Sequence, residues 1–137
     1  MSKSIITSSA APVTGFSDRS TPSPIVQAIR FNNMLFVSGQ GPLDPVTKQV
    51  EDGDIETQTR QTLANLRSVL EAAGAGFADV VNMRVILRDV RDFKRFNEVF
   101  RQEIGKEKVT RTCVGGTPHR DGVNIEIDCV AMFDQPA

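Results

Sequence analysis

The sequence predicts an α+β fold, a two-layer sandwich in which two helices cover one face of a mixed β-sheet of about six strands. Two observations lead to this prediction. Apolar residues recur at spacings of three and four in residues 55–73 and again in residues 93–104, as in amphipathic helices. The other apolar stretches are short or alternate with polar residues, as strands do. Because two helices cover only one face of such a sheet, we expect the other face to be open.

The N-terminal third of the chain reads as strands and turns. Ile5 and Ile6 indicate a brief first strand, and the Ser-, Thr- and Pro-containing residues that follow, up to residue 24, indicate an irregular segment. Residues 26–36 contain two apolar runs around Asn32-Asn33. Since Asn tolerates positive φ, this dipeptide predicts a two-residue hairpin turn. Residues 38–45, SGQGPLDP, are rich in Gly and Pro and predict a loop after the strand.

The clearest helix is predicted over residues 55–73. Asp54 is a suitable N-cap, and Gly74 and Gly76 supply the C-terminal stop. Its apolar stripe consists of Ile55, Thr59, Leu63, Leu66 and Leu70.

The second half of the chain predicts a strand, a helix and two more strands. In residues 81–88, an inward face of Val81, Met83, Val85 and Leu87 alternates with Asn82, Arg84, Ile86 and Arg88. Asp89 and Asp92 have the spacing of a capping box that opens the second helix. The inner face of that helix would comprise Phe93, Phe96, Phe100 and Ile104.

Residues 109–114 and 123–133 predict the last two strands. The final strand alternates clearly, because every second residue from Val123 to Phe133 is apolar or small. Its other face begins with Asn124, Glu126 and Asp128, so polar groups would lie among apolar neighbours on the open face of the sheet. A mixed face of this kind suits an interface between subunits that contains pockets.

Composition limits the classes of function. A chain of 137 residues predicts one domain, residues 1–137, and 16 basic against 17 acidic residues give a net charge of −1. That balance argues against binding to nucleic acid or to anionic membranes through bulk charge. No apolar run approaches the roughly 20 residues that span a bilayer. We expect a cytoplasmic protein, because the N-terminus lacks a secretory signal core and the 2 Cys follow no disulfide pattern.

Familiar catalytic motifs do not occur in the sequence. It has no GxGxxG, GxxxxGK[ST], HExxH or GxSxG motif, and a single His, His119, together with 2 Cys cannot form the usual structural zinc site. We therefore predict neither a metal nor a cofactor. Catalysis would depend on Arg, carboxylates, backbone amides or water.

Three residues stand out as candidates for chemistry. Arg111 would share a strand face with Val109 and Cys113, either as an edge-strand cation paired to an acid or as a receptor for a carboxylate. Glu126 is either a solvated or interface carboxylate, or a general acid that also positions a water molecule. Cys113 has no partner His nearby in the sequence, so a packing role is expected.

Five blocks of the sequence, in order, resemble the Rid family of reactive-intermediate enamine/imine deaminases, which are YjgF-type proteins also labelled endoribonuclease L-PSP. The blocks are LFVSGQGPLDP, QTRQTLANLRSVLEAAGAGFADVV, RDVRDFKRFNEVF, TRTCV and NIEIDCVA. Together they span nearly all of residues 26–133, which makes the resemblance specific.

The resemblance implies a chorismate-mutase-like fold and a homotrimer with ligand pockets at the subunit interfaces. It also implies a small carboxylate-bearing imine or enamine as substrate, which is hydrolysed to a 2-oxo acid and ammonia. By this resemblance Arg111 binds the carboxylate and Glu126 lies near the attacking water. The other pocket residues would be Ser38, Gly39, Asn97 and Cys113.

The chain departs from the family pattern at one pocket wall. Where family members carry a GPYSQA-like segment, this chain has SPIVQA, so Ile25 replaces Tyr and Val26 replaces Ser. An apolar wall at Ile25 predicts a modest preference for imines with apolar side chains. A carboxylate-binding module without turnover remains an alternative function. A ribonuclease or translation inhibitor is disfavoured by the acidic pI and by the absence of Trp and Tyr.

Overall fold

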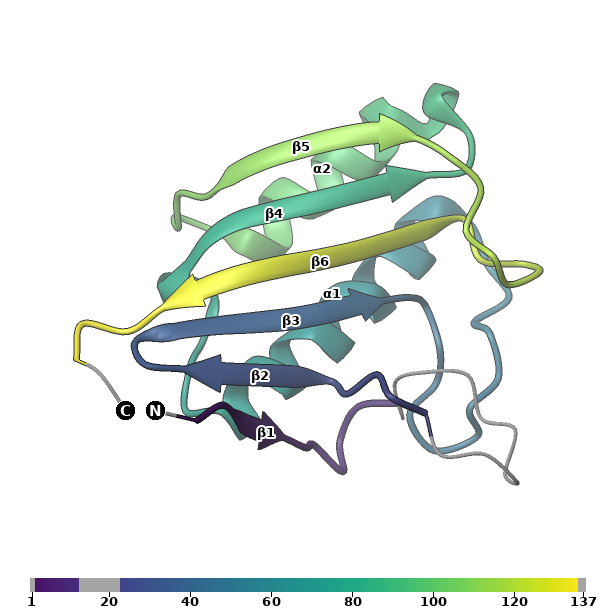
Figure 1. The fold of residues 1–137 in the computed structure, drawn as a ribbon. Coiled ribbons are helices and arrows are strands. Elements are labelled where there is room, and N and C mark those ends of the chain that lie inside the picture. Colours follow the sequence, from purple (N-terminus) through teal and green to yellow (C-terminus); the bar gives the residue numbers. More distant parts are fainter. Residues whose placement is uncertain (1, 13–22, 136–137) are drawn as a thin grey trace.

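The computed structural model describes residues 2–12 and 23–135, and within them it has the predicted two-layer α+β architecture (Figure 1). One sheet has the strand order β1-β2-β3-β6-β4-β5, in which β4 and β5 are parallel and the other neighbours are antiparallel. Both long helices pack on the same face of this sheet. The strands are β1 (Ser4–Ile6), β2 (Ala28–Phe31), β3 (Met34–Gln40), β4 (Val80–Leu87), β5 (Thr110–Gly115) and β6 (Ile125–Met132). The helices are α1 (Ile55–Ala72), α2 (Phe93–Ile104) and the short 3-10 helices η1 (Phe77–Asp79) and η2 (Val90–Asp92).

The local signals that delimit α1 and the first hairpin are confirmed. The Asp54 carboxylate accepts a hydrogen bond from the Thr57 amide at 2.8 Å, and α1 ends one residue earlier than predicted. Gly74 then takes a φ of +77°, which only Gly adopts readily. Asn32 has a φ of 59° in the two-residue turn between β2 and β3.

Two predictions about strands were wrong, and a β-bulge explains each. Ser38, Gly39 and Gln40 belong to β3 and not to a loop, because the register against β6 shifts between Val37 and Gln40 and the strand continues beyond the shift. In β4 a second shift, between Val80 and Asn82, turns Val81 outward to 41% exposure. Val80 occupies the buried position in its place.

The start of the second helix also differs from the prediction. The Asp89 carboxylate accepts from the Arg91 amide and caps η2, so α2 begins only at Phe93 and has no side-chain cap. Phe93 is therefore in the first turn of α2 and is 42% exposed, whereas Phe96, Phe100 and Ile104 are buried as predicted.

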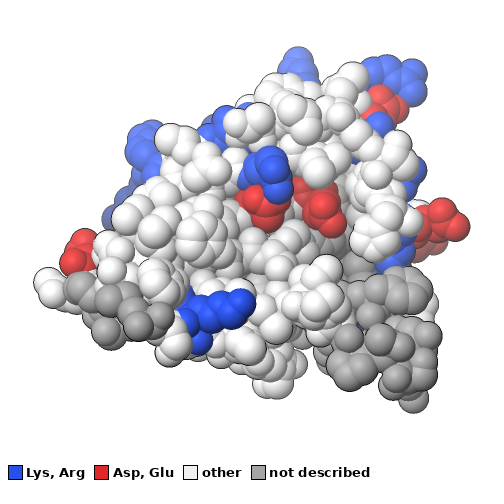
Figure 2. Space-filling model, in the orientation of Figure 1, with Lys and Arg blue, Asp and Glu red and all other residues white. Residues whose placement is uncertain are grey.

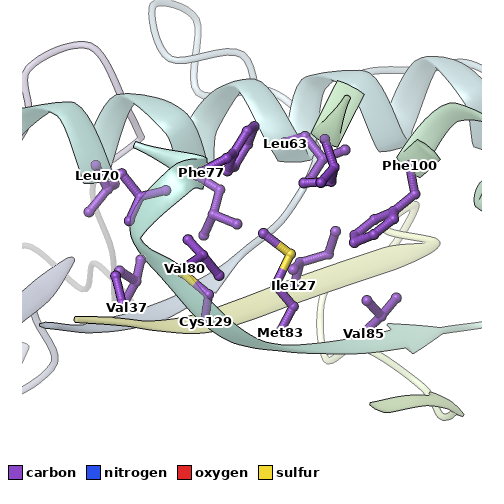
Figure 3. Packing of buried hydrophobic residues seen from close by; sticks show 14 of the residues in the cluster. Val37, Leu63, Leu70, Phe77, Val80, Met83, Val85, Phe100, Ile127 and Cys129 are labelled. Carbon is purple, nitrogen blue, oxygen red and sulfur yellow. The ribbon is translucent and has the colours of Figure 1, made fainter. Parts of the chain in front are cut away.

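The hydrophobic core fills the space between the sheet and the helices (Figure 3). Alternate residues of β6 enter it, as predicted, from Ile125 to Ala131. Leu63, Leu66 and Leu70 of α1 face them and are fully buried. No helix in the described part of the chain is long and apolar enough to cross a membrane. The face of the sheet opposite the helices has no covering element in residues 2–12 and 23–135.

Candidate functional site

Arg111 lies on the helix side of β5, half-buried against α2. Its Nη1 donates a hydrogen bond to Asn97 Oδ1 at 2.7 Å. Its guanidinium carbon lies 4.7, 5.3 and 5.6 Å from the ring centroids of Phe100, Phe96 and Phe93. Among the described residues Arg111 has no acidic partner, so the structure does not support the alternative of an edge-strand ion pair. A fixed cation without a counter-charge can bind an anion.

The aromatic support of Arg111 was not predicted from the sequence. The spacing of Phe93, Phe96 and Phe100 predicts the inner face of a helix, and the sequence alone does not show which strand residue they meet. In the structure the Phe96 and Phe100 rings lie 5.5 Å apart and form a row along α2 beneath the guanidinium.

The two thiols are poor nucleophiles. Burial raises the pKa of the Cys113 thiol, and the neighbouring Arg111 lowers it by less. Burial, together with the smaller effect of the Asp128 charge, raises the pKa of the Cys129 thiol to about 12. Both thiols are therefore protonated at neutral pH, which supports the packing role predicted for Cys113.

Glu126 lies on the open face of the sheet, directly over Gly39 of β3. A Cβ atom added at Gly39 would lie 2.9 Å from Glu126 Cδ, so a larger residue there would displace the end of the Glu126 side chain. Within the described residues Glu126 makes no hydrogen bond or ion pair. Its carboxylate is thus free to hold a water molecule or a substrate proton.

Ser38 of β3 contacts the segment before β2, which carries Ile25. The Ser38 hydroxyl donates to the Val26 carbonyl at 2.6 Å, and its amide donates to the Gln27 carbonyl at 2.9 Å. Ser38 thereby anchors the segment that carries Ile25, whose side chain is 53% exposed.

Arg111 and Glu126 are not brought together within one chain. Arg111 pairs in register with Met83 of β4, whereas Glu126 pairs with Ile86. Met83 and Ile86 are an odd number of residues apart, so their side chains point to opposite faces. In addition, β5 and β6 flank β4, which separates them by roughly 9–10 Å in the sheet. One small substrate cannot reach both groups of a single chain.

Two other features of the described residues do not involve the predicted site. The described residues contain no cluster of His, Cys, Asp and Glu that could hold a metal ion. A surface hollow of about 400 Å³ beside α1 contains none of the predicted site residues. It is lined by Glu51, Thr57, Arg60, Gln61 and Ala64.

Comparison with known proteins agrees with the sequence blocks. A family model described as endoribonuclease L-PSP matches residues 18–133. A RutC family protein of Pyrococcus horikoshii is 43% identical over 108 residues, which are 79% of this chain and 86% of that protein. TdcF of Escherichia coli, which carries the provisional name of a reactive intermediate deaminase, is 33% identical over 112 residues, 80% of this chain and 86% of TdcF.

Solved structures share the whole fold. A Rid family protein of Yersinia pestis, YyfA, superposes with a TM-score of 0.86 at 30% identity, covering 96% of this chain and 100% of YyfA. The structure of E. coli TdcF with bound serine has a TM-score of 0.82 at 31% identity, covering 96% of this chain and 99% of TdcF. On this evidence the chain belongs to the Rid family, the RutC/YjgF-type proteins whose family model is described as endoribonuclease L-PSP.

Proposed function

We propose that the protein is a hydrolytic deaminase of small imine and enamine acids, acting as a cytoplasmic homotrimer. The observation that carries the proposal is the cation of Arg111, fixed by Asn97 and the α2 rings and lacking a counter-charge in the described chain. Such a group suits the carboxylate of a small acid, because guanidinium and carboxylate form two parallel hydrogen bonds. The provisional name of TdcF and the serine bound in its structure support a small ligand that bears a carboxylate.

A second copy of the chain would complete the site. Since Arg111 and Glu126 occupy opposite faces of one sheet, the Arg111 of one copy must meet the Glu126 of another to act on the same substrate. The open face that carries Glu126 also exposes large apolar side chains, as interfaces between subunits do. These residues are Ile5, Phe31, Phe36, Val114 and Met132.

The chemistry needs only water and these side chains. Arg111 holds the substrate carboxylate, and Glu126 orients a water molecule toward the imine carbon. The water oxygen bonds to that carbon, and its protons pass by way of Glu126 to the nitrogen. The carbon–nitrogen bond then breaks, which releases ammonia and leaves a 2-oxo acid. An enamine enters the same route after it tautomerises to the imine.

The test is the release of 2-oxo acid from imines generated in situ from alanine, serine, leucine and methionine. Arg111→Lys keeps the charge but loses the planar fork, so kcat/KM should fall by about a hundredfold while the circular dichroism spectrum is unchanged. Across the wild-type series, Ile25 should give a modest preference that grows with apolar side-chain size.

Two outcomes separate the alternatives. Equal activity of Arg111→Lys and the wild type would remove Arg111 from the site. If the wild type binds 2-oxo acids saturably but turns over no imine, the protein is a carboxylate-binding module. Ile25, at the position of the family's Tyr, is the feature that favours this second function, because the wall has lost a hydroxyl donor.

A further inference from the structure

Three charged side chains lie together on an otherwise largely uncharged face of the sheet. Figure 2 shows this open face as mostly white, with a blue group beside two red groups near its centre. By register, the strand residues that face this side and carry charge are Arg84, Glu126 and Asp128. The proposed mechanism uses only Glu126, so the role of the other two needs an explanation.

Within this cluster the Arg84 guanidinium pairs with the Asp128 carboxylate and not with Glu126. Arg84 Nε donates to Asp128 Oδ2 at 3.0 Å, and Nη2 of the same guanidinium is also 3.0 Å from that oxygen. Arg84 and Asp128 are direct cross-strand partners, and Ile86 and Glu126 are the next partners on this face. Glu126 is thus the diagonal neighbour of Arg84, and diagonal neighbours lie about 7–8 Å apart, a gap that a long side chain can bridge.

We propose that Asp128 is a positioning residue that holds Arg84 away from Glu126 and so keeps the Glu126 carboxylate free to orient water. Without Asp128, the nearest acid for Arg84 on this face is Glu126. An Arg84–Glu126 ion pair would turn the carboxylate away from substrate and occupy the lone pairs that hold the water. This inference rests on the proposed role of Glu126 in imine hydrolysis.

The test is a double-mutant cycle on Arg84 and Asp128 in the imine assay. Asp128→Asn should lower kcat by about fivefold, an effect typical of a partly exposed ion pair, and should leave KM unchanged because Arg111 still binds the carboxylate. Arg84→Met should be close to wild type. The double variant Arg84→Met/Asp128→Asn should recover kcat, because no cation remains to capture Glu126.

Salt gives a second readout. The loss in Asp128→Asn should shrink as ionic strength rises, because salt screens the new ion pair. Glu98→Gln is the matched control, since Glu98 also pairs with an arginine, Arg101, but lies on the helix layer. It should leave kcat unchanged. Sedimentation of each variant shows whether the association state is altered.

The possible failures are distinguishable. If no imine is turned over, or if Glu126→Gln is fully active, the proposed function fails and this inference fails with it. If Glu126→Gln is inactive but Asp128→Asn has wild-type kcat, only the inference is overturned. A loss in Asp128→Asn that persists in the double variant, without change in association, also overturns it and would indicate a structural role for Asp128.

Discussion

At the scale of single residues, the candidate site depends as much on a missing side chain as on those present. Gly39 lies beneath Glu126, and its backbone has no positive φ that would by itself require Gly. Gly is suited to this position because a Cβ atom would take the space that the Glu126 side chain occupies. A carboxylate that lies over a strand backbone can keep its orientation only if no Cβ projects into it, and Glu126 Cδ and Cγ lie 2.9 and 3.2 Å from where that atom would be.

Gly39→Ala should therefore displace Glu126 and lower kcat by about tenfold to a hundredfold, a part of what a positioned acid–base group contributes. The KM should change little, because Arg111 remains in place. Gly41→Ala is the matched control, since the nearest atom to its added Cβ lies at an ordinary 3.5 Å. Steady-state imine hydrolysis measures both variants, and thermal unfolding confirms that they fold. A Gly39→Ala enzyme with wild-type kcat would show that the position of Glu126 does not matter.

At the scale of elements, the sequence predicts the secondary structure better than it predicts orientation. Helix α1, the Asn32-Asn33 turn and the alternation of β6 follow from local spacing and capping, so they were predictable. The two β-bulges were not, because a register shift arises from pairing with a distant strand. For the same reason the sequence identifies Arg111 as a candidate but does not show that α2 rings support it.

The side chain that anchors two loops could not be predicted from the sequence either. Gln58 falls within a predicted helix, where a Gln ordinarily faces solvent, yet it is 2% exposed. Its amide nitrogen donates to the carbonyls of Glu51 and Gly122 at 3.0 and 2.8 Å, and its oxygen accepts from the Asn124 amide at 2.9 Å. One side chain of α1 thus ties together the loop before the helix and the loop that leads into β6.

Gln58→Leu should reduce the free energy of unfolding by about 2–4 kcal/mol, because it removes three partly buried hydrogen bonds that hold two loops. Gln102→Leu, at an exposed position of α2, should change it by less than about 0.5 kcal/mol. Urea denaturation at one fixed protein concentration provides the comparison, since association also contributes to apparent stability. Equal stability of Gln58→Leu and the wild type would mean that the loops hold their own positions.

At the scale of the whole molecule, the two faces of the sheet carry different parts of the proposed site. The helix face provides the core and, at its β5 edge, the anchored cation of Arg111. The open face carries Glu126, the Arg84–Asp128 pair and a set of exposed apolar side chains. A monomer would leave this apolar surface in water and would keep Arg111 and Glu126 apart. Association of copies through the open face would bury the apolar side chains and would also bring the two groups together.

If the protein is the proposed homotrimer, it should sediment at three times its chain mass of 15.0 kDa at micromolar concentration. Phe36→Asp should shift it toward the monomer, because Phe36 is 47% exposed on the open face and a carboxylate there would have to be desolvated in an interface. Val46→Asp, at an 86% exposed turn position, introduces the same charge away from the sheet and should leave the trimer intact. Imine hydrolysis should fall with the trimer fraction, because in the proposed site Arg111 and Glu126 belong to different copies. A fully active Phe36→Asp monomer, or a monomeric wild type, would contradict the shared site.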